Sequence, residues 1–212
     1  MNDMNEWAID ESVDFSMLEF WLPPPDPVRL FRDWFERATQ FGVSEPGALS
    51  LATADALGRV SNRIVKMITV TADGLVFTSH ADSRKGRDLA ATGWASAVLY
   101  WRETNQQVIL TGQVHQLPDT ESDALWLARA PGTHAMSVAS HQSSTLDDEI
   151  ALRAEAGRLA AAGEPLPRPA RWVGYTLVPD NVEFWHIGQD RLHLRLLYER
   201  VGGHWTNRRL QP

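Results

Sequence analysis

The stretch that decides this chain's fold is RIVKMITVTADGLVFTSHADSRKGRDL, residues 63–89. It contains a β-branched run over residues 63–70, a turn at 72–74 that ends in glycine, and a second strand-like run over 75–78, which together predict a hairpin. Ser83 then precedes Arg84 and Lys85 and can cap a helix that begins there. Free backbone N–H groups, the positive end of the helix dipole and two cations would meet at this point. The sequence therefore predicts an anion-binding site.

The same residues also fit a surface hairpin followed by a solvated basic turn. Basic side chains at a helix N-terminus oppose the dipole, so without an anion they would be poorly placed. Arg63 lies across the hairpin, from where it could reach the same loop. Both points favour the anion site.

The composition is that of a globular protein with one domain. The chain has 212 residues, of which 43% are hydrophobic and 22% charged, enough for one sizeable core. No segment approaches the ~18 consecutive apolar residues of a membrane span.

The N-terminal region lacks the features of a secretory signal or transit peptide, so we expect a cytoplasmic protein. Because cysteine is absent, redox chemistry would need a bound cofactor.

Charge is unevenly distributed along the chain. Seven acidic residues precede Arg29, the first basic residue, and the remaining chain has 20 basic and 20 acidic residues. A neutral body with local arginine clusters argues against nucleic-acid binding and favours small anionic ligands. Residues 1–26, acidic and proline-rich at their end, are predicted to form a mobile arm that packs loosely or on a partner subunit. Residues 27–212 are predicted to form the single domain.

Hydrophobic patterning predicts a mainly β fold with peripheral helices. Short strands at hairpin spacing over residues 48–117, with one brief helix, favour an antiparallel barrel over a parallel sheet. Gly112 is expected at a bulge or a close approach of two backbones. The predicted strands cover residues 48–53, 63–70, 75–78, 94–101, 107–117, 172–178, 182–187, 191–198 and 204–210, and the predicted longer helices 26–42, 119–129 and 147–162.

The last of these segments carries a row of donors. If residues 191–198 form one strand, the side chains of Arg191, His193 and Arg195 share one face of the sheet. Such a row could hold an anionic ligand, or it could be a cationic row that faces solvent.

Several stretches together resemble a known family. They are RIV, VFTSHADSRKG, YWRETNQQV, HQSS, PLPRP, VEFW, RLHLRLLYER and the ending RRLQP, and they span about Pro27 to Pro212. The chain resembles the pyridoxamine 5′-phosphate oxidase family of FMN-binding split barrels, and within it most closely the phenazine-biosynthesis flavoprotein oxidases. The resemblance implies an antiparallel split β-barrel of the FMN-binding type, and a homodimer with FMN at the subunit interface. Hairpins over 172–212 would serve dimerisation and ligand binding.

The resemblance also implies a set of cofactor-binding residues. The FMN phosphate would bind Arg63, Arg84 and Lys85, with Thr78, Ser79 and Ser83 alongside. Gln107 would meet the flavin ring, Gln142 and Ser143 would reach FMN across the dimer interface, and Trp185 and Arg195 would complete the site.

Substrate-contacting positions of the family fall on Arg129, Thr133, Arg191 and His193. Two positions depart from the vitamin-forming oxidases, because Ile68 replaces a lysine that holds the substrate phosphate and Leu125 replaces a tyrosine that helps it. Loss of a lysine from a partly buried anion site costs about 2–5 kcal/mol. Pyridoxine 5′-phosphate should therefore bind poorly, whereas a flat tricyclic carboxylate would suit these residues.

The resulting hypothesis is an FMN-dependent oxidase that dehydrogenates reduced phenazine carboxylates, with O2 as electron acceptor and H2O2 as product. The alternatives are pyridoxamine/pyridoxine 5′-phosphate oxidase and a noncatalytic flavin- or haem-binding split barrel. His193 could accept a proton or hydrogen-bond to substrate. No metal site is expected, because no histidine pair has helical ligand spacing with an acidic partner.

Overall fold

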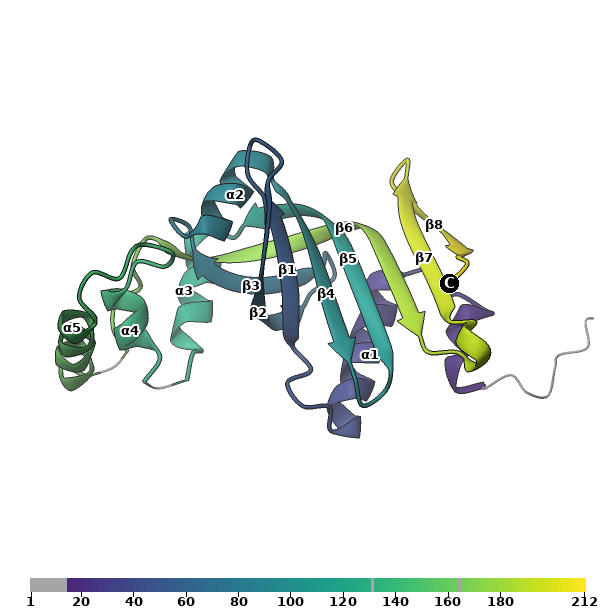
Figure 1. Ribbon diagram of the computed structural model, residues 1–212, viewed down its shortest axis with the longest axis horizontal. Helices are drawn as coiled ribbons and strands as arrows, with labels where there is room; N and C mark the ends of the chain where they lie inside the picture. Colours follow the sequence, from purple (N-terminus) through teal and green to yellow (C-terminus); the bar gives the residue numbers. More distant parts are fainter. Residues whose placement is uncertain (1–14, 131, 164) are drawn as a thin grey trace, which may run out of the picture.

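An antiparallel sheet closes on itself in the computed structural model, which describes residues 15–130, 132–163 and 165–212. Its strands run in the order β3-β2-β1-β4-β5-β6-β7-β8, and a further pairing of β3 with β6 closes the first six into a barrel, so the predicted barrel is confirmed. β7 and β8 extend the sheet beyond this closure (Figure 1). The strands are β1 Ala48–Ala54, β2 Val60–Val70, β3 Leu75–His80, β4 Trp94–Trp101, β5 Gln106–Gln116, β6 Trp172–His186, β7 Leu194–Val201 and β8 His204–Arg209.

Helices lie around the barrel rather than on one side of it (Figure 1). They are η1 Phe15–Phe20, α1 Pro27–Phe41, α2 Arg84–Thr92, α3 Asp119–Leu127, α4 His134–Ala139, α5 Glu149–Ala161 and η2 Gln189–Arg191. Figure 1 shows α3, α4 and α5 at one end of the molecule's long axis and β7, β8 and η2 at the other. None of the helices in the described ranges is long and apolar enough to cross a membrane.

Two glycines allow β6 to cross the barrel as one long strand. A side chain at Gly112 would overlap the carbonyl oxygen of Val178, and one at Gly74 would overlap that of Leu177. The β5–β6 register shifts at Gly112, opposite Pro179, which confirms the predicted bulge. The bulge absorbs the break in pairing, so the prediction of two strands over 172–178 and 182–187 is wrong.

Helix α1 is set by its capping residues and covers the barrel core. The Asp26 side chain accepts hydrogen bonds from the backbone N–H groups of Val28 and Arg29, and Gly42 ends the helix with a φ of 88°. The buried face of α1, which includes Phe31 and Trp34, packs in one core with inward-facing strand residues, among them Leu49, Leu51, Phe77, Leu99, Leu110, Leu177 and Phe184.

The predicted mobile arm does not describe residues 17–26. Phe20 is 1% exposed and its ring lies 5.9 Å from that of Trp34. Tyr198 Oη donates a hydrogen bond of 2.9 Å to Pro24 O, and Glu19 accepts from the Trp34 indole. This part packs on the barrel because the ring of Phe20 is buried there beside Trp34. Residues 1–14 of the predicted arm lie outside the described residues.

Helix α3 has no side-chain hydrogen bond at its N-cap, and Asp119 forms an ion pair with Arg168 at 2.8 Å. Two further features differ from the predictions. The short helix α4 was not predicted, because six residues carry too little periodic signal. Residues 191–198 are not one strand, since Asp190 and Arg191 have φ values of 52° and 63° and β7 begins only at Leu194. The three side chains of the predicted donor row therefore do not share one strand face.

Candidate functional site

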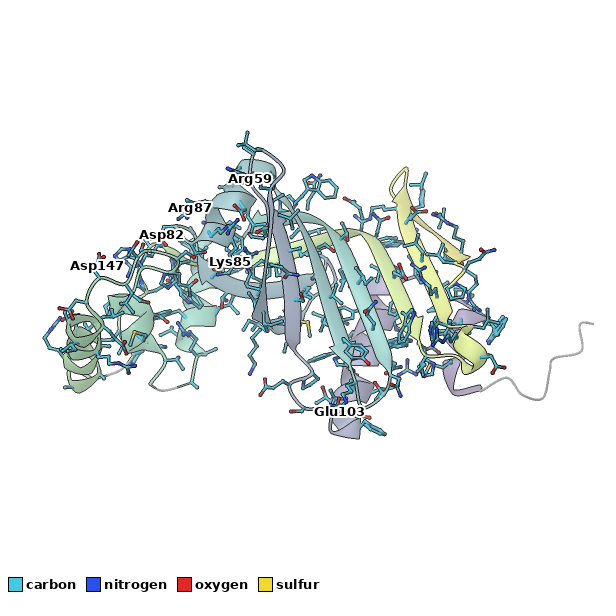
Figure 2. The ribbon with its side chains drawn as sticks, in the orientation of Figure 1. Arg59, Asp82, Lys85, Arg87, Glu103 and Asp147 are labelled. Atoms are coloured by element: carbon cyan, nitrogen blue, oxygen red, sulfur yellow. The ribbon has the colours of Figure 1, made fainter. Side chains whose placement is uncertain are left out.

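A cavity of about 420 Å³ lies where β2, the start of α2 and the α4–α5 connection meet. It contains three cationic side chains, and no carboxylate lines it among the described residues. Figure 2 shows Lys85 on this side of the molecule, between the barrel and the helical end. The lining residues are Ser61, Asn62, Arg63, Arg84, Lys85, Gln142 and Ser143.

A buried carboxylate network fixes Arg63. Its guanidinium donates to Leu51 O at 3.1 Å, Thr53 Oγ1 at 2.7 Å and Ser61 Oγ at 2.5 Å. Asp88 lies 3.9 Å away and accepts from the hydroxyls of Thr53 and Ser61 at 2.7 and 3.0 Å. Sequence reasoning missed this network, although Asp88 follows Arg84 by one helical turn.

The β3–α2 junction provides hydroxyl groups around Lys85. Lys85 Nζ donates to Ser79 Oγ at 3.0 Å and to Gln142 Oε1 at 3.1 Å. Ser83 caps α2 by accepting from Gly86 N at 3.2 Å, as predicted. Thr78 does not line the cavity, and strand alternation places its side chain on the opposite face of β3 from Ser79.

The cations of the cavity repel one another. Burial lowers the pKa of Lys85, and the neighbouring Arg63 lowers it further. Burial also lowers the pKa of Arg63, and Arg84 adds to this while Asp88 opposes it. An anion with several acceptor oxygens would relieve this repulsion, which fits a phosphate group.

Gln142 and Ser143 lie in the same cavity of the same chain. Ser143 Oγ accepts a hydrogen bond of 3.1 Å from Arg84 N, one of the free N–H groups at the start of α2. The two residues thus join the basic cluster within one chain, and their contact with the cofactor across an interface stays a prediction.

A second group of predicted residues forms a row across three strands. Gln107 of β5 pairs with Trp185 of β6, which pairs with Arg195 of β7. Arg195 binds both carboxylate oxygens of Glu183 at 2.7 and 3.0 Å, and this pairing raises the pKa of Arg195. The ring of His193 lies 5.0 Å from that of Trp185.

The strand row and the cavity lie on separate parts of the barrel. Arg63 shares its face with Leu51, which is fully buried, and the neighbouring cavity residue Asn62 faces outward. Gln107 pairs with Tyr100, which is 55% exposed, so the strand row faces outward. β2 and β5 are three strand positions apart, which is roughly 14 Å, and no residue of the row lines the cavity among the described residues.

The predicted substrate residues divide in the same way. Arg129 lies at the helical end, between the rings of Trp126 and Trp172 at 4.9 and 5.2 Å, and donates to Thr133 O at 3.1 Å. Leu125 packs over Gly174 on the same side. Arg191 and His193 lie at the opposite end, beside β7. Ile68 is 47% exposed on β2.

Models of known protein families match most of the chain. Residues 35–163 match the model described as pyridoxamine 5′-phosphate oxidase. Residues 172–212 match that of the pyridoxine 5′-phosphate oxidase C-terminal dimerisation region. The chain belongs to the pyridoxamine 5′-phosphate oxidase family. The resemblance inferred from the sequence motifs is thereby confirmed.

Members of this family with known names include phenazine enzymes. The dihydrophenazinedicarboxylate synthase of Burkholderia lata is 48% identical over 212 residues, covering all of both chains. That of Pseudomonas chlororaphis is 46% identical over 205 residues, covering 97% of this chain and 92% of its own. The pyridoxine/pyridoxamine 5′-phosphate oxidase of Myxococcus xanthus is 39% identical over 198 residues, covering 92% and 96%.

The fold is also that of a solved family structure. The crystal structure of PhzG from Burkholderia lata, in complex with tetrahydrophenazine-1-carboxylic acid, matches with a TM-score of 0.92 at 49% identity. The match covers 95% of this chain and 100% of that one. The predicted split-barrel fold is thus confirmed.

Proposed function

We propose that this family member is an FMN-dependent oxidase of phenazine biosynthesis, which dehydrogenates dihydro- to hexahydrophenazine carboxylates. The observation that carries the proposal is the cavity with three cations and no lining carboxylate, at the N-terminus of α2. Similarity to the two phenazine relatives supports the choice of substrate.

The basic cavity would hold the FMN phosphate. Arg63, held by Asp88, and Lys85, held by Ser79, present fixed positive charge, and Arg84 adds a third cation at the rim. The Ser143 hydroxyl accepts from Arg84 N, so its own O–H stays available to donate to a phosphate oxygen. When bound, FMN supplies the redox chemistry, since it takes a hydride from the reduced ring and passes the electrons to O2, giving H2O2.

The strand row would complete the site from a second subunit. Gln107, Trp185 and Arg195 do not line the phosphate cavity of their own chain, and β5 lies three strand positions from β2. A symmetric dimer would bring each row to the partner's cavity and create two identical sites. The match to a C-terminal dimerisation region over 172–212 supports this homodimer.

Arginine and apolar side chains would select the substrate. The two indole rings restrict Arg129, so its guanidinium can bind a carboxylate with little loss of side-chain entropy. Arg191 of the partner subunit would provide a second guanidinium that binds the substrate's carboxylate. Ile68 and Leu125 offer apolar surface where a phosphate would need a cation, which favours a flat ring system.

His193 is placed to donate a hydrogen bond. Its Nδ1 accepts from Gly188 N at 3.3 Å, so the neutral ring carries its proton on Nε2. In this arrangement Nε2–H can donate to a substrate carboxylate but cannot accept a proton. The proton released from the substrate nitrogen would then pass to solvent.

Anaerobic reduction of the bound flavin tests the proposal. The FMN-loaded protein is mixed with a reduced phenazine carboxylate or with pyridoxine 5′-phosphate, and loss of flavin absorbance is followed against free FMN. Faster bleaching by the phenazine substrate alone is expected. Faster bleaching by pyridoxine 5′-phosphate would instead identify a pyridoxine phosphate oxidase, and no bleaching by either would leave a noncatalytic flavin barrel. A Soret band in the purified protein would indicate haem.

A further inference from the structure

The segment 140–143 carries Gln142 and Ser143 into the cavity, yet it belongs to neither α4 nor α5. Residues 141–150 are all exposed, so packing does not hold it. Ser143 also has a φ of 71°, which a non-glycine residue adopts only when its surroundings favour it. Gln142 and Ser143 bond to Lys85 Nζ and Arg84 N, and the course of the segment that brings them there depends on hydrogen bonds at its start.

Arg171 makes two of these bonds. Its Nη2 donates to the carbonyl oxygens of Val138 and Ser140, the latter at 3.1 Å, at the C-terminal end of α4. A cation at this end satisfies free carbonyls and complements the helix dipole. The backbone oxygen of Arg171 accepts from Ala81 N at 2.6 Å. Arg171 thus joins the start of the segment to the loop that precedes α2.

Asp82 makes a second, more exposed contact from that same loop. Its Oδ2 lies 3.3 Å from Nδ1 of His141, one residue before Gln142. Figure 2 shows Asp82 between α2 and the helical end of the molecule. Arg171 therefore contacts Ser140, and Asp82 contacts His141, which are the two residues before Gln142.

We propose that Arg171 is a positioning residue for FMN, with Asp82 as a weaker second one: together they hold the 140–143 segment so that Gln142 and Ser143 complete the phosphate cavity. This inference rests on the proposed function. It assigns Arg171 no contact with the cofactor. Arg171 would act on FMN affinity only through Gln142 and Ser143. Its substitution should therefore weaken binding of the FMN phosphate and not of the flavin ring.

Flavin affinity in Arg171→Met tests the proposal, measured by titration of the apo protein with FMN and with riboflavin, which lacks the phosphate. Loss of a charge-assisted hydrogen-bonding group predicts an FMN Kd weakened about tenfold or more, with riboflavin changed less than about twofold. Arg168→Met is the matched control. Arg168 also lies between α5 and β6, but its side chain binds Asp119 and Asp123 of α3. Its FMN Kd should stay within about twofold of wild type.

A double-mutant cycle separates positioning from general destabilisation. In a Gln142→Ala/Ser143→Ala background, Arg171→Met should weaken FMN binding by less than about twofold, because the side chains it positions are gone. Amide exchange over residues 138–145 should rise in Arg171→Met and not in Arg168→Met. Arg171→Lys, which keeps the charge and one donor, should give an intermediate Kd if Arg171→Met does not fold.

Two results would overturn the inference. One is an unchanged FMN Kd in Arg171→Met, and the other is an equal loss in the wild-type and double-alanine backgrounds. Wild-type protein that binds no FMN at all would instead refute the proposed function, so the two failures are distinguishable.

Discussion

The proposed substrate choice depends most on Ile68, which is apolar and 47% exposed on β2. The family resemblance implies a lysine at this position in the vitamin-forming oxidases. Ile68→Lys should raise kcat/KM for pyridoxine 5′-phosphate by about tenfold to a hundredfold, since a cation gains a charge-assisted bond to phosphate. Steady-state kinetics with H2O2 detection would measure this. Val60→Lys, on the same strand and 67% exposed, is the control and should leave kcat/KM unchanged.

His80 should make stability depend on pH. Its ring is fully buried without a hydrogen-bond partner among the described residues, and burial and then Arg171 lower its pKa to about 4. The unfolded chain, with a pKa near 6.5, binds the proton more readily, so stability is complete above pH 6.5 and falls towards pH 4. The difference corresponds to about 3 kcal/mol.

Urea unfolding of wild type and His80→Leu at pH 7, 5.5 and 4 would measure this contribution. The wild type should lose about 3 kcal/mol more than the variant between pH 7 and pH 4. Parallel pH profiles would show that His80 does not titrate in this range.

At the scale of the element, local chemistry determined what could be read from the sequence. The hairpin over residues 63–78, the Ser83 cap and the α1 boundaries at Asp26 and Gly42 all depend on adjacent residues, and the structure confirms them. The continuous β6 depends on contacts with distant strands. The turn that displaces Arg191 uses positive φ at two non-glycine residues, which sequence reasoning did not predict.

The β5 bulge should tolerate no side chain. Gly112→Ala would place a methyl group against the Val178 carbonyl of β6, and the barrel wall cannot move aside, so a loss of about 3 kcal/mol in unfolding free energy is expected. Gly157→Ala, in the open middle of α5, should change it by less than about 1 kcal/mol and in the stabilising direction. Chemical denaturation of both variants gives the comparison.

At the scale of the whole molecule, the family resemblance predicts the site residues but not their grouping. Its motifs predict Gln142 and Arg195 alike as cofactor residues. Only the folded chain shows that the first joins the basic cavity and the second the outward strand row. Likewise Asp88, which holds Arg63, has no motif of its own, because its role arises from the packing of α2 on β1 and β2.

This division predicts that two inactive subunits can restore one another. Lys85→Met removes a cation from the cavity and Arg195→Met disrupts the strand row, so each homodimer should have two damaged sites. In a mixed dimer both substitutions fall in one site and the other is wild type. Random pairing of equal amounts makes half of the dimers mixed, so about a quarter of wild-type activity should return.

Co-refolding of the two variants, with flavin reduction as readout, would test this complementation. Lys85→Met mixed with Arg63→Met is the control, because both substitutions damage the same half and random pairing restores no site. Activity in the first mixture alone would establish that each site draws on two chains. Its absence, with mixed dimers verified by differently tagged subunits, would require each chain to bring the cavity and the strand row together itself. That would contradict the proposed division of each site between two chains.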